Sequence, residues 1–231
     1  MKEPQILTFK PGANRDFAER LLGRREKNSV SRSTKIRLEN GIRQLPHLLK
    51  PRLVYTVAEA AAIEKGQVRL NSGLVLESAK LAWSLKKAHK LVFFVATVGK
   101  AIDQQIENLM EAGSLADAYV MDALGSAAIE WVADRFQDTM EEKYGDQGLV
   151  SGLRFSPGYC DWPLMEQKKV FTVLETEKVG VQLGETCLMN PRKSVSAVFG
   201  LYPNHAGPQS REMNPCRRCA KKDCLARRTD G

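Results

Sequence analysis

The sequence lacks any apolar run long enough to cross a bilayer. Its longest candidate, "LVFFVATVG" from Leu91 to Gly99, is far shorter than the roughly 18 to 20 residues that a membrane-spanning helix needs. The first residues, "MKEPQILTFKPGANRD", lack the apolar core and small-residue cleavage site of a secretory signal peptide. Internal repeats and low-complexity tracts are also missing. We therefore expect a globular protein of the cytoplasm without a membrane partner.

Cysteine is scarce and unevenly placed. The chain has five cysteines in 231 residues, an odd number, and three of them lie between Cys216 and Cys224. A secreted disulfide framework normally has an even number of cysteines spread along a short chain. This distribution argues against such a framework.

Sequence patterns of nucleic-acid readers are absent as well. The chain has no zinc-finger spacing of the DNA-reading type and no interleaved basic and aromatic residues that would stack bases. The net charge is +8, but residues 1–50 carry +7 and residues 205–231 carry +4, which leaves −3 for the middle. The segment "STKIRLENGIRQLPHLLK" could form a phosphate-binding helix, but a solvated basic face is the simpler interpretation. We expect no nucleic-acid partner.

Hydrophobic periodicity predicts alternating helices and strands in the first two thirds of the chain. The β-branched run "RLVYTV" and the apolar run "KLVFFVATVG" predict strands, the second fully buried. Apolar residues at helical spacing predict helices over residues 13–26, 35–49, 74–87, 100–113 and 115–144.

The last third predicts further strands. A helix is expected over Pro163–Glu175, capped by Asp161, and "VGVQLGETCLM" and "SVSAVFGLY" are expected to pair as strands. This order predicts an α+β fold with a mostly antiparallel sheet flanked by helices. We divide it into a helical N-terminal segment of the same domain (1–80), a core (81–203) and a Cys-rich basic tail (204–231).

One face of the long predicted helix combines small residues with carboxylates: Ala123, Ser126, Ala127, Glu130 and Asp134. Small side chains allow another group to approach closely, and a partly buried glutamate needs a partner. Two interpretations remain open. Glu130 either pairs with an arginine where this helix packs tightly, or contacts a cationic ligand.

The stretch "RFSPGYCDWP", from Arg154 to Pro163, follows this helix. Arginine binds carboxylates at two points, and Gly158 lets a ligand approach the backbone. Tyr159 supplies a flat face with a polar tip. This combination suits a small zwitterion with an aromatic part.

The sequence "RFSPGYCDWPLMEQKKVFTVLETEKVGVQLGETCLMNPRKSVSAVFGL" resembles the reactivation domain of cobalamin-dependent methionine synthase. That family has an R-x-x-P-G-Y loop, a helix, an "IG-x-x-L-T-E-S" strand, a proline turn and an "SVS" strand in this order. The upstream stretches "VFFVATVGKAIDQQI" and "DALGSAAIEWVADR" resemble its shorter, stand-alone members. The resemblance covers roughly residues 85–202, so the core above is expected to be activation-domain-like.

The resemblance implies a function for the chain. The family's domain binds S-adenosylmethionine and offers its methyl group to the cobalt of a corrinoid, while a flavodoxin- or ferredoxin-like donor supplies an electron. The chain lacks a cobalamin-binding "D-x-H-x-x-G" signature. We therefore expect a stand-alone methyltransferase component that supports reductive remethylation of cob(II)alamin on a separate corrinoid protein, such as a truncated methionine synthase.

The resemblance also implies roles for single residues. Arg154 would pair with the methionine carboxylate, Ser156 would contribute backbone groups, and Gly158 would allow close approach. Tyr159 would line the adenosine or corrinoid side, and Glu130 would face the ammonium and sulfonium end. The family's two-tyrosine segment after the last strand is missing, and Tyr202 is a poor substitute for it.

The tail segment "NPCRRCAKKDCLARR" places Cys216, Cys219 and Cys224 at C-x2-C-x4-C spacing, so three soft ligands could converge on one metal. Candidates for a fourth ligand are Cys187, Cys160 and His205. Zinc would make this a structural site, whereas a [4Fe–4S] cluster would be a point where electrons enter. Metal-free cysteines in a basic tail are the plainer alternative.

A non-catalytic function is the competing interpretation of the whole chain. The same fold could serve as a module that binds a corrinoid protein or senses a metal, having lost S-adenosylmethionine binding. Calorimetry with S-adenosylmethionine distinguishes the two hypotheses.

Overall fold

A five-stranded antiparallel sheet forms the centre of the computed structural model, which describes residues 1–23 and 30–203. The strand order is β1-β2-β6-β10-β7, and every neighbouring pair is antiparallel. The predicted fold class is therefore confirmed. The strands are β1 (Gln5–Thr8), β2 (Arg52–Ala58), β6 (Lys90–Thr97), β10 (Ser194–Pro203) and β7 (Leu149–Ser151).

The central strand β6 is buried from Leu91 to Thr97, as its uninterrupted apolar run predicts. Strand β2 lies on one side of it and β10 on the other, so that Val95 is opposite both Val54 and Ser196. A strand with no polar alternation must be covered on both faces. The sheet accordingly has an apolar cluster on each face.

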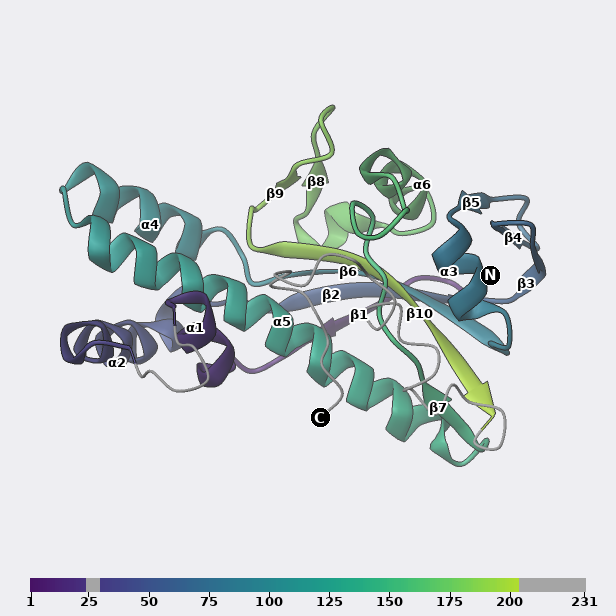
Figure 1. Cartoon of the computed structure of the whole chain (residues 1–231), viewed down its shortest axis with the longest axis horizontal. Coiled ribbons are helices and arrows are strands. Elements are labelled where there is room, and N and C mark those ends of the chain that lie inside the picture. Colours follow the sequence, from purple (N-terminus) through teal and green to yellow (C-terminus); the bar gives the residue numbers. More distant parts are fainter. Residues whose placement is uncertain (24–29, 204–231) are drawn as a thin grey trace.

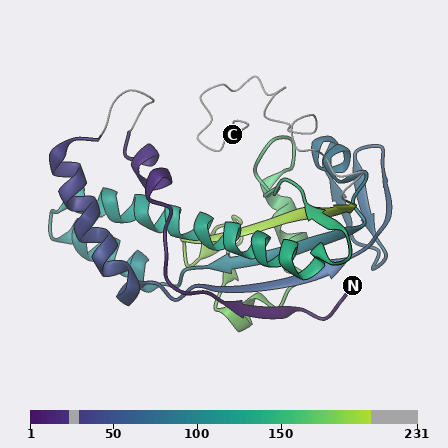
Figure 2. The ribbon, with the colours of Figure 1, turned by 90° about the horizontal axis from the view of Figure 1, so that it is seen from below.

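The long helix α5 (Leu115–Gly145) runs along the first face of the sheet (Figures 1 and 2). Its predicted apolar stripe packs there, with Leu124, Val132 and Phe136 fully buried. Three helices gather at one end of this layer: α1 (Arg15–Leu21), α2 (Arg32–Leu48) and α4 (Ala101–Glu111).

Shorter elements cover the second face. Helix α3 (Ala79–Leu85) and a small sheet of β3 (Ala60–Glu64), β4 (Gln67–Leu70) and β5 (Val75–Glu77) lie at the end opposite α4 (Figure 1). The other elements on this face are η1 (Leu164–Glu166), α6 (Gln167–Phe171), η2 (Thr176–Val179) and the β8 (Gln182–Leu183) and β9 (Met189–Asn190) pair.

The N-terminal segment, residues 1–80, is not mainly helical, so that prediction is wrong. Besides α1 and α2 it contains β1 to β5, and β1 and β2 belong to the central sheet. The predicted helix over 74–87 is likewise divided. Gly73 has a left-handed backbone (φ 87°) in the turn before β5, and Ser78 caps a helix that begins only at Ala79.

Two predictions about the last third also need correction. The expected helix Pro163–Glu175 is reduced to η1 and the short α6. The stretch "VGVQLGETCLM" does not pair with "SVSAVFGLY", because β8 pairs with β9 while β10 pairs with β6 and β7. Within the described residues, no helix is both long and apolar enough to span a membrane.

Candidate functional site

The loop from Arg154 to Pro163 leaves the edge of the central sheet, where it passes from one face to the other. Phe155 forms an isolated bridge with Val198, with two backbone hydrogen bonds of 2.8 Å. Side chains alternate between the two faces along an extended segment. Arg154 therefore lies against α5, while Phe155 packs in the apolar cluster of the second face.

Arg154 is held by three polar side chains of α5. Its Nη1 donates to Asp134 Oδ1 at 2.7 Å and to Gln137 Oε1 at 3.1 Å, and its Nη2 donates to Glu130 Oε2 at 3.1 Å. The spacing of these acceptors along the helix places them on one face. The Arg154 side chain is only 8% exposed, whereas those of Glu130 and Asp134 are 43% and 49% exposed.

This arrangement confirms the first interpretation of Glu130, and its contact with a cationic ligand stays a prediction. The glutamate pairs with an arginine, and that arginine is the one predicted to hold a ligand carboxylate. Two carboxylates share one guanidinium, so the group carries a net charge of −1 and presents its acidic side to solvent. Such a surface attracts a cation.

Gln137 and one further α5 side chain, Glu141, anchor the segment before Arg154, and no sequence motif singled them out. Gln137 Nε2 donates to Ser151 Oγ at 2.6 Å and to the Gly152 carbonyl at 2.8 Å, and Glu141 accepts from Ser151. Both residues follow Asp134 at helical spacing, so continuing the Glu130–Asp134 face along the predicted helix would have identified them.

The loop itself is a tight turn with an exposed tip. The Ser156 carbonyl accepts from the Tyr159 N–H at 3.2 Å, and the Gly158 N–H donates to the Trp162 carbonyl at 2.8 Å. Gly158 has a φ of 90°, which explains the glycine. Tyr159 is 53% exposed, while Trp162 is buried. The predicted residues Arg154, Ser156, Gly158 and Tyr159 thus lie on one loop, which begins against α5 with Arg154 and is bonded to α3 through Asp161.

Asp161 caps a different helix from the one predicted. Its carboxylate accepts from Ser78 Oγ at 2.5 Å and from the Lys80 N–H at 3.1 Å, at the start of α3. Partial burial raises the pKa of Asp161, but the hydrogen bonds from Ser78 and from backbone N–H groups outweigh it and lower the pKa below its ordinary value.

The small-residue face of α5 serves mainly for packing. Ala123 and Ala127 are both buried, and Ala127 belongs to the first-face cluster. Ser126 instead accepts from Lys193 Nζ at 3.0 Å, and Lys193 also pairs with Asp122 at 2.7 Å. This lysine is therefore engaged within the chain.

Tyr202 lies in the core. Its side chain is 1% exposed, and its hydroxyl donates to the Ser84 carbonyl at 2.7 Å. Burial raises the pKa of this phenol well above its ordinary value, and the bond to Ser84 only partly opposes that effect. Tyr202 is therefore buried away from any ligand and is no substitute for the family's two-tyrosine segment.

The predicted metal ligands Cys216, Cys219 and Cys224, and the candidate His205, lie outside the described residues. Cys187 is buried with its Sγ 3.6 Å from Met165 Sδ, and Cys160 is exposed on the loop. Across residues 1–23 and 30–203, no three His, Cys, Asp or Glu side chains gather in a way that could hold a metal ion. The metal site stays a prediction.

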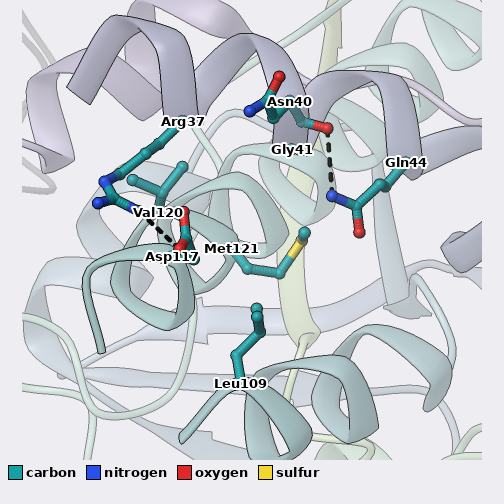
Figure 3. A pocket seen from close by; sticks show the side chains of 8 residues that line it. All are labelled: Arg37, Asn40, Gly41, Gln44, Leu109, Asp117, Val120 and Met121. Atoms are coloured by element: carbon teal, nitrogen blue, oxygen red, sulfur yellow. Dashed lines mark hydrogen bonds and ion pairs between the residues drawn. The ribbon is translucent and has the colours of Figure 1, made fainter. Parts of the chain in front are cut away.

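A cavity of about 240 Å³ lies between α2, α4 and α5 (Figure 3). The Arg37–Asp117 ion pair (2.6 Å) crosses one side of it, and Gln44 donates to the Asn40 carbonyl on another. None of the predicted site residues within the described part of the chain lines it. The lining residues are Arg37, Asn40, Gly41, Gln44, Leu109, Asp117, Val120 and Met121.

Comparisons with known proteins identify relatives whose similarity includes α5 and the loop that follows it. The sequence profile of the family "Vitamin B12 dependent methionine synthase, activation domain" matches residues 84–214, more than half of the chain. The fold is similar to that of the MetH reactivation domain in its crystal structure bound to AdoHcy. The TM-score is 0.66 at 17% identity, over 87% of this chain and 79% of that chain. No curated protein matches.

Proposed function

Because the chain belongs to the vitamin B12 dependent methionine synthase activation domain family, we propose that it binds S-adenosylmethionine beside α5. With this ligand it supports reductive remethylation of cob(II)alamin on a separate corrinoid protein. The observation that carries the proposal is the contact of Arg154 with Glu130 and Asp134 at the base of a glycine-containing loop whose tip is exposed.

The charges of this group fit the charges of the ligand. S-adenosylmethionine carries a sulfonium, an ammonium and a carboxylate. The half-exposed Glu130 and Asp134 would stabilise the two cations, which water would otherwise solvate. The ligand carboxylate would accept hydrogen bonds from one edge of the Arg154 guanidinium, where it would displace one of the α5 acceptors.

The loop would hold the remainder of the ligand. Gly158 has no side chain at the exposed tip, so a ligand can approach the backbone there. The exposed ring of Tyr159 offers a flat face to adenine or to the corrinoid. Binding would therefore spread from the α5 carboxylates to the loop tip.

The proposed reaction has two steps, a one-electron reduction and a methyl transfer. One electron from a flavodoxin- or ferredoxin-like donor reduces cob(II)alamin to cob(I)alamin. Cobalt then attacks the sulfonium methyl with its electron pair, the carbon–sulfur bond breaks, and methylcobalamin and S-adenosylhomocysteine form. The chain's role is to bind and orient the methyl donor, since proximity and alignment alone lower the barrier substantially.

A remethylation assay tests this function directly. The chain, S-adenosylmethionine, a reduced donor and a truncated methionine synthase carrying cob(II)alamin should give methylcobalamin, followed by visible absorption. Omitting the chain or the S-adenosylmethionine should abolish the product. Equal product without the chain would contradict the proposal.

One observation favours the non-catalytic alternative. Arg154 already donates to three acceptors on α5, so a ligand carboxylate must compete with intramolecular bonds. If this competition fails, the chain would bind a corrinoid protein without binding S-adenosylmethionine. A pull-down that retains the corrinoid protein, together with a flat S-adenosylmethionine titration, would support that function.

A further inference from the structure

The tip of the candidate loop is exposed to solvent and has an unusual backbone conformation. Pro157 and Trp162 are buried, but the four residues between them are exposed. Within this stretch Gly158 and Cys160 both have left-handed backbones, with φ values of 90° and 58°. A non-glycine residue in that conformation is strained and persists only when its surroundings hold it.

Asp161, which directly follows the strained Cys160, is bonded to α3. Its Oδ1 accepts from Ser78 Oγ at 2.5 Å, and both of its carboxylate oxygens lie within 3.3 Å of the Lys80 N–H. The Ser78 hydroxyl also accepts from the Leu81 N–H at 3.0 Å, so it caps α3 and bonds the loop at the same time. The carboxylate therefore joins the loop to the N-terminal end of a helix that is distant along the sequence.

Helix α3 is a fixed point to which a loop can be attached. Leu81 and Leu85 are fully buried in the second-face cluster. Near the other end of the helix, the Ser84 carbonyl accepts from the buried Tyr202 hydroxyl. Displacing α3 would thus disturb the core of the domain.

We infer that Asp161 is a positioning residue for ligand binding: its bond to Ser78 and the α3 backbone holds Gly158 and Tyr159 in their binding arrangement. The inference rests on the proposed S-adenosylmethionine binding. Asp161 does not touch the ligand in this account. It raises the fraction of molecules whose loop is ready to bind.

The test compares Asp161→Ala and Ser78→Ala with wild type by equilibrium dialysis against S-adenosylmethionine. If Asp161→Ala leaves about a tenth of the molecules with a competent loop, the apparent Kd rises about tenfold. Ser78→Ala should weaken binding less, because the Lys80 N–H still reaches the carboxylate. The double variant should bind no more weakly than Asp161→Ala, since both changes break the same contact.

Ser31→Ala is the matched control. It removes the side-chain cap of α2, where Ser31 Oγ accepts from the Thr34 N–H at 3.1 Å. This variant should lower the melting temperature but leave the Kd unchanged. Hydrogen exchange adds a second readout, because Asp161→Ala should speed exchange at the Gly158 and Trp162 amides.

The outcomes separate the two hypotheses. Wild type that binds no S-adenosylmethionine overturns the proposed function. Wild type that binds, with Asp161→Ala binding equally well despite a lowered melting temperature, overturns only the positioning role and makes Asp161 a helix cap. Additive losses in the double variant would also contradict the shared contact.

Discussion

Arg154 Nη2 lies 3.1 Å from Glu130 Oε2, so two residues expected to contact oppositely charged groups of one ligand hold each other. The bond joins the middle of α5 to the base of the loop. Asp134, one turn along the helix from Glu130, completes the group at 2.7 Å from Arg154 Nη1. This ion-paired group therefore keeps the loop beside the helix.

Replacing Arg154 with alanine should lower the free energy of unfolding by about 1–3 kcal/mol. The arginine is nearly buried, but its partners are about half exposed and regain water when it is lost. Urea denaturation measures the change. Arg135→Ala is the control, since its pair with Asp138 is exposed on both sides and should be worth under about 0.5 kcal/mol. Equal losses in the two variants would mean that Arg154 is not held as described.

Gly152→Ala should destabilise the fold by about 1–3 kcal/mol, because the new methyl group overpacks the core. A Cβ there would lie 2.5 Å from the ring of Tyr202, which is buried and bonded through its hydroxyl. Gly145→Ala meets nothing within 4 Å and is the matched control, expected to be neutral or slightly stabilising. Thermal unfolding compares the two. An unchanged melting temperature in Gly152→Ala would show that the Tyr202 ring can move aside without cost and would contradict the prediction.

The Asp161 carboxylate should make stability depend on acidic pH. Its pKa in the folded protein is below the ordinary value of 3.8, so its stabilisation is fully present above that pH. The stabilisation is lost as the pH falls through the folded pKa. Denaturation between about pH 2.5 and 6 should therefore show that wild type exceeds Asp161→Asn by a constant margin above about pH 5, and that the margin shrinks at lower pH. A margin that does not change with pH would contradict the charged contact.

The cysteine tail predicts a metal. Anaerobic reconstitution should give visible absorption and bound iron if Cys216, Cys219 and Cys224 hold a [4Fe–4S] cluster. Alanine at any of the three should abolish both signals. A colourless protein with one zinc per chain would remove the electron-transfer role, and a protein without metal would remove the site.

The strongly patterned elements could be predicted from the sequence. The apolar run of β6 and the stripe of α5 each encode burial within one segment, and both predictions are confirmed. Short elements gave weaker signals. In residues 74–87, helical spacing continues through β5, and only the cap at Ser78 marks the true start of the helix.

Contacts between distant residues could not be predicted in the same way. The sequence correctly indicated that Asp161 has capping ability, but any nearby helix start would satisfy it, and only the fold selects α3. The sequence predicts the pairing of Glu130 with an arginine as one of two alternatives. Its partner, Arg154, was known only as a candidate ligand contact because nothing in the sequence gives the angle between α5 and the loop.

Titration calorimetry with S-adenosylmethionine tests the central claim most directly. Wild type should bind with a saturable signal, and Arg154→Ala should bind at least about tenfold more weakly, because a charge-assisted hydrogen bond contributes about 1.5–3 kcal/mol. Arg135→Ala should match wild type. No heat from wild type at millimolar ligand, with Arg154→Ala indistinguishable from it, would contradict the account.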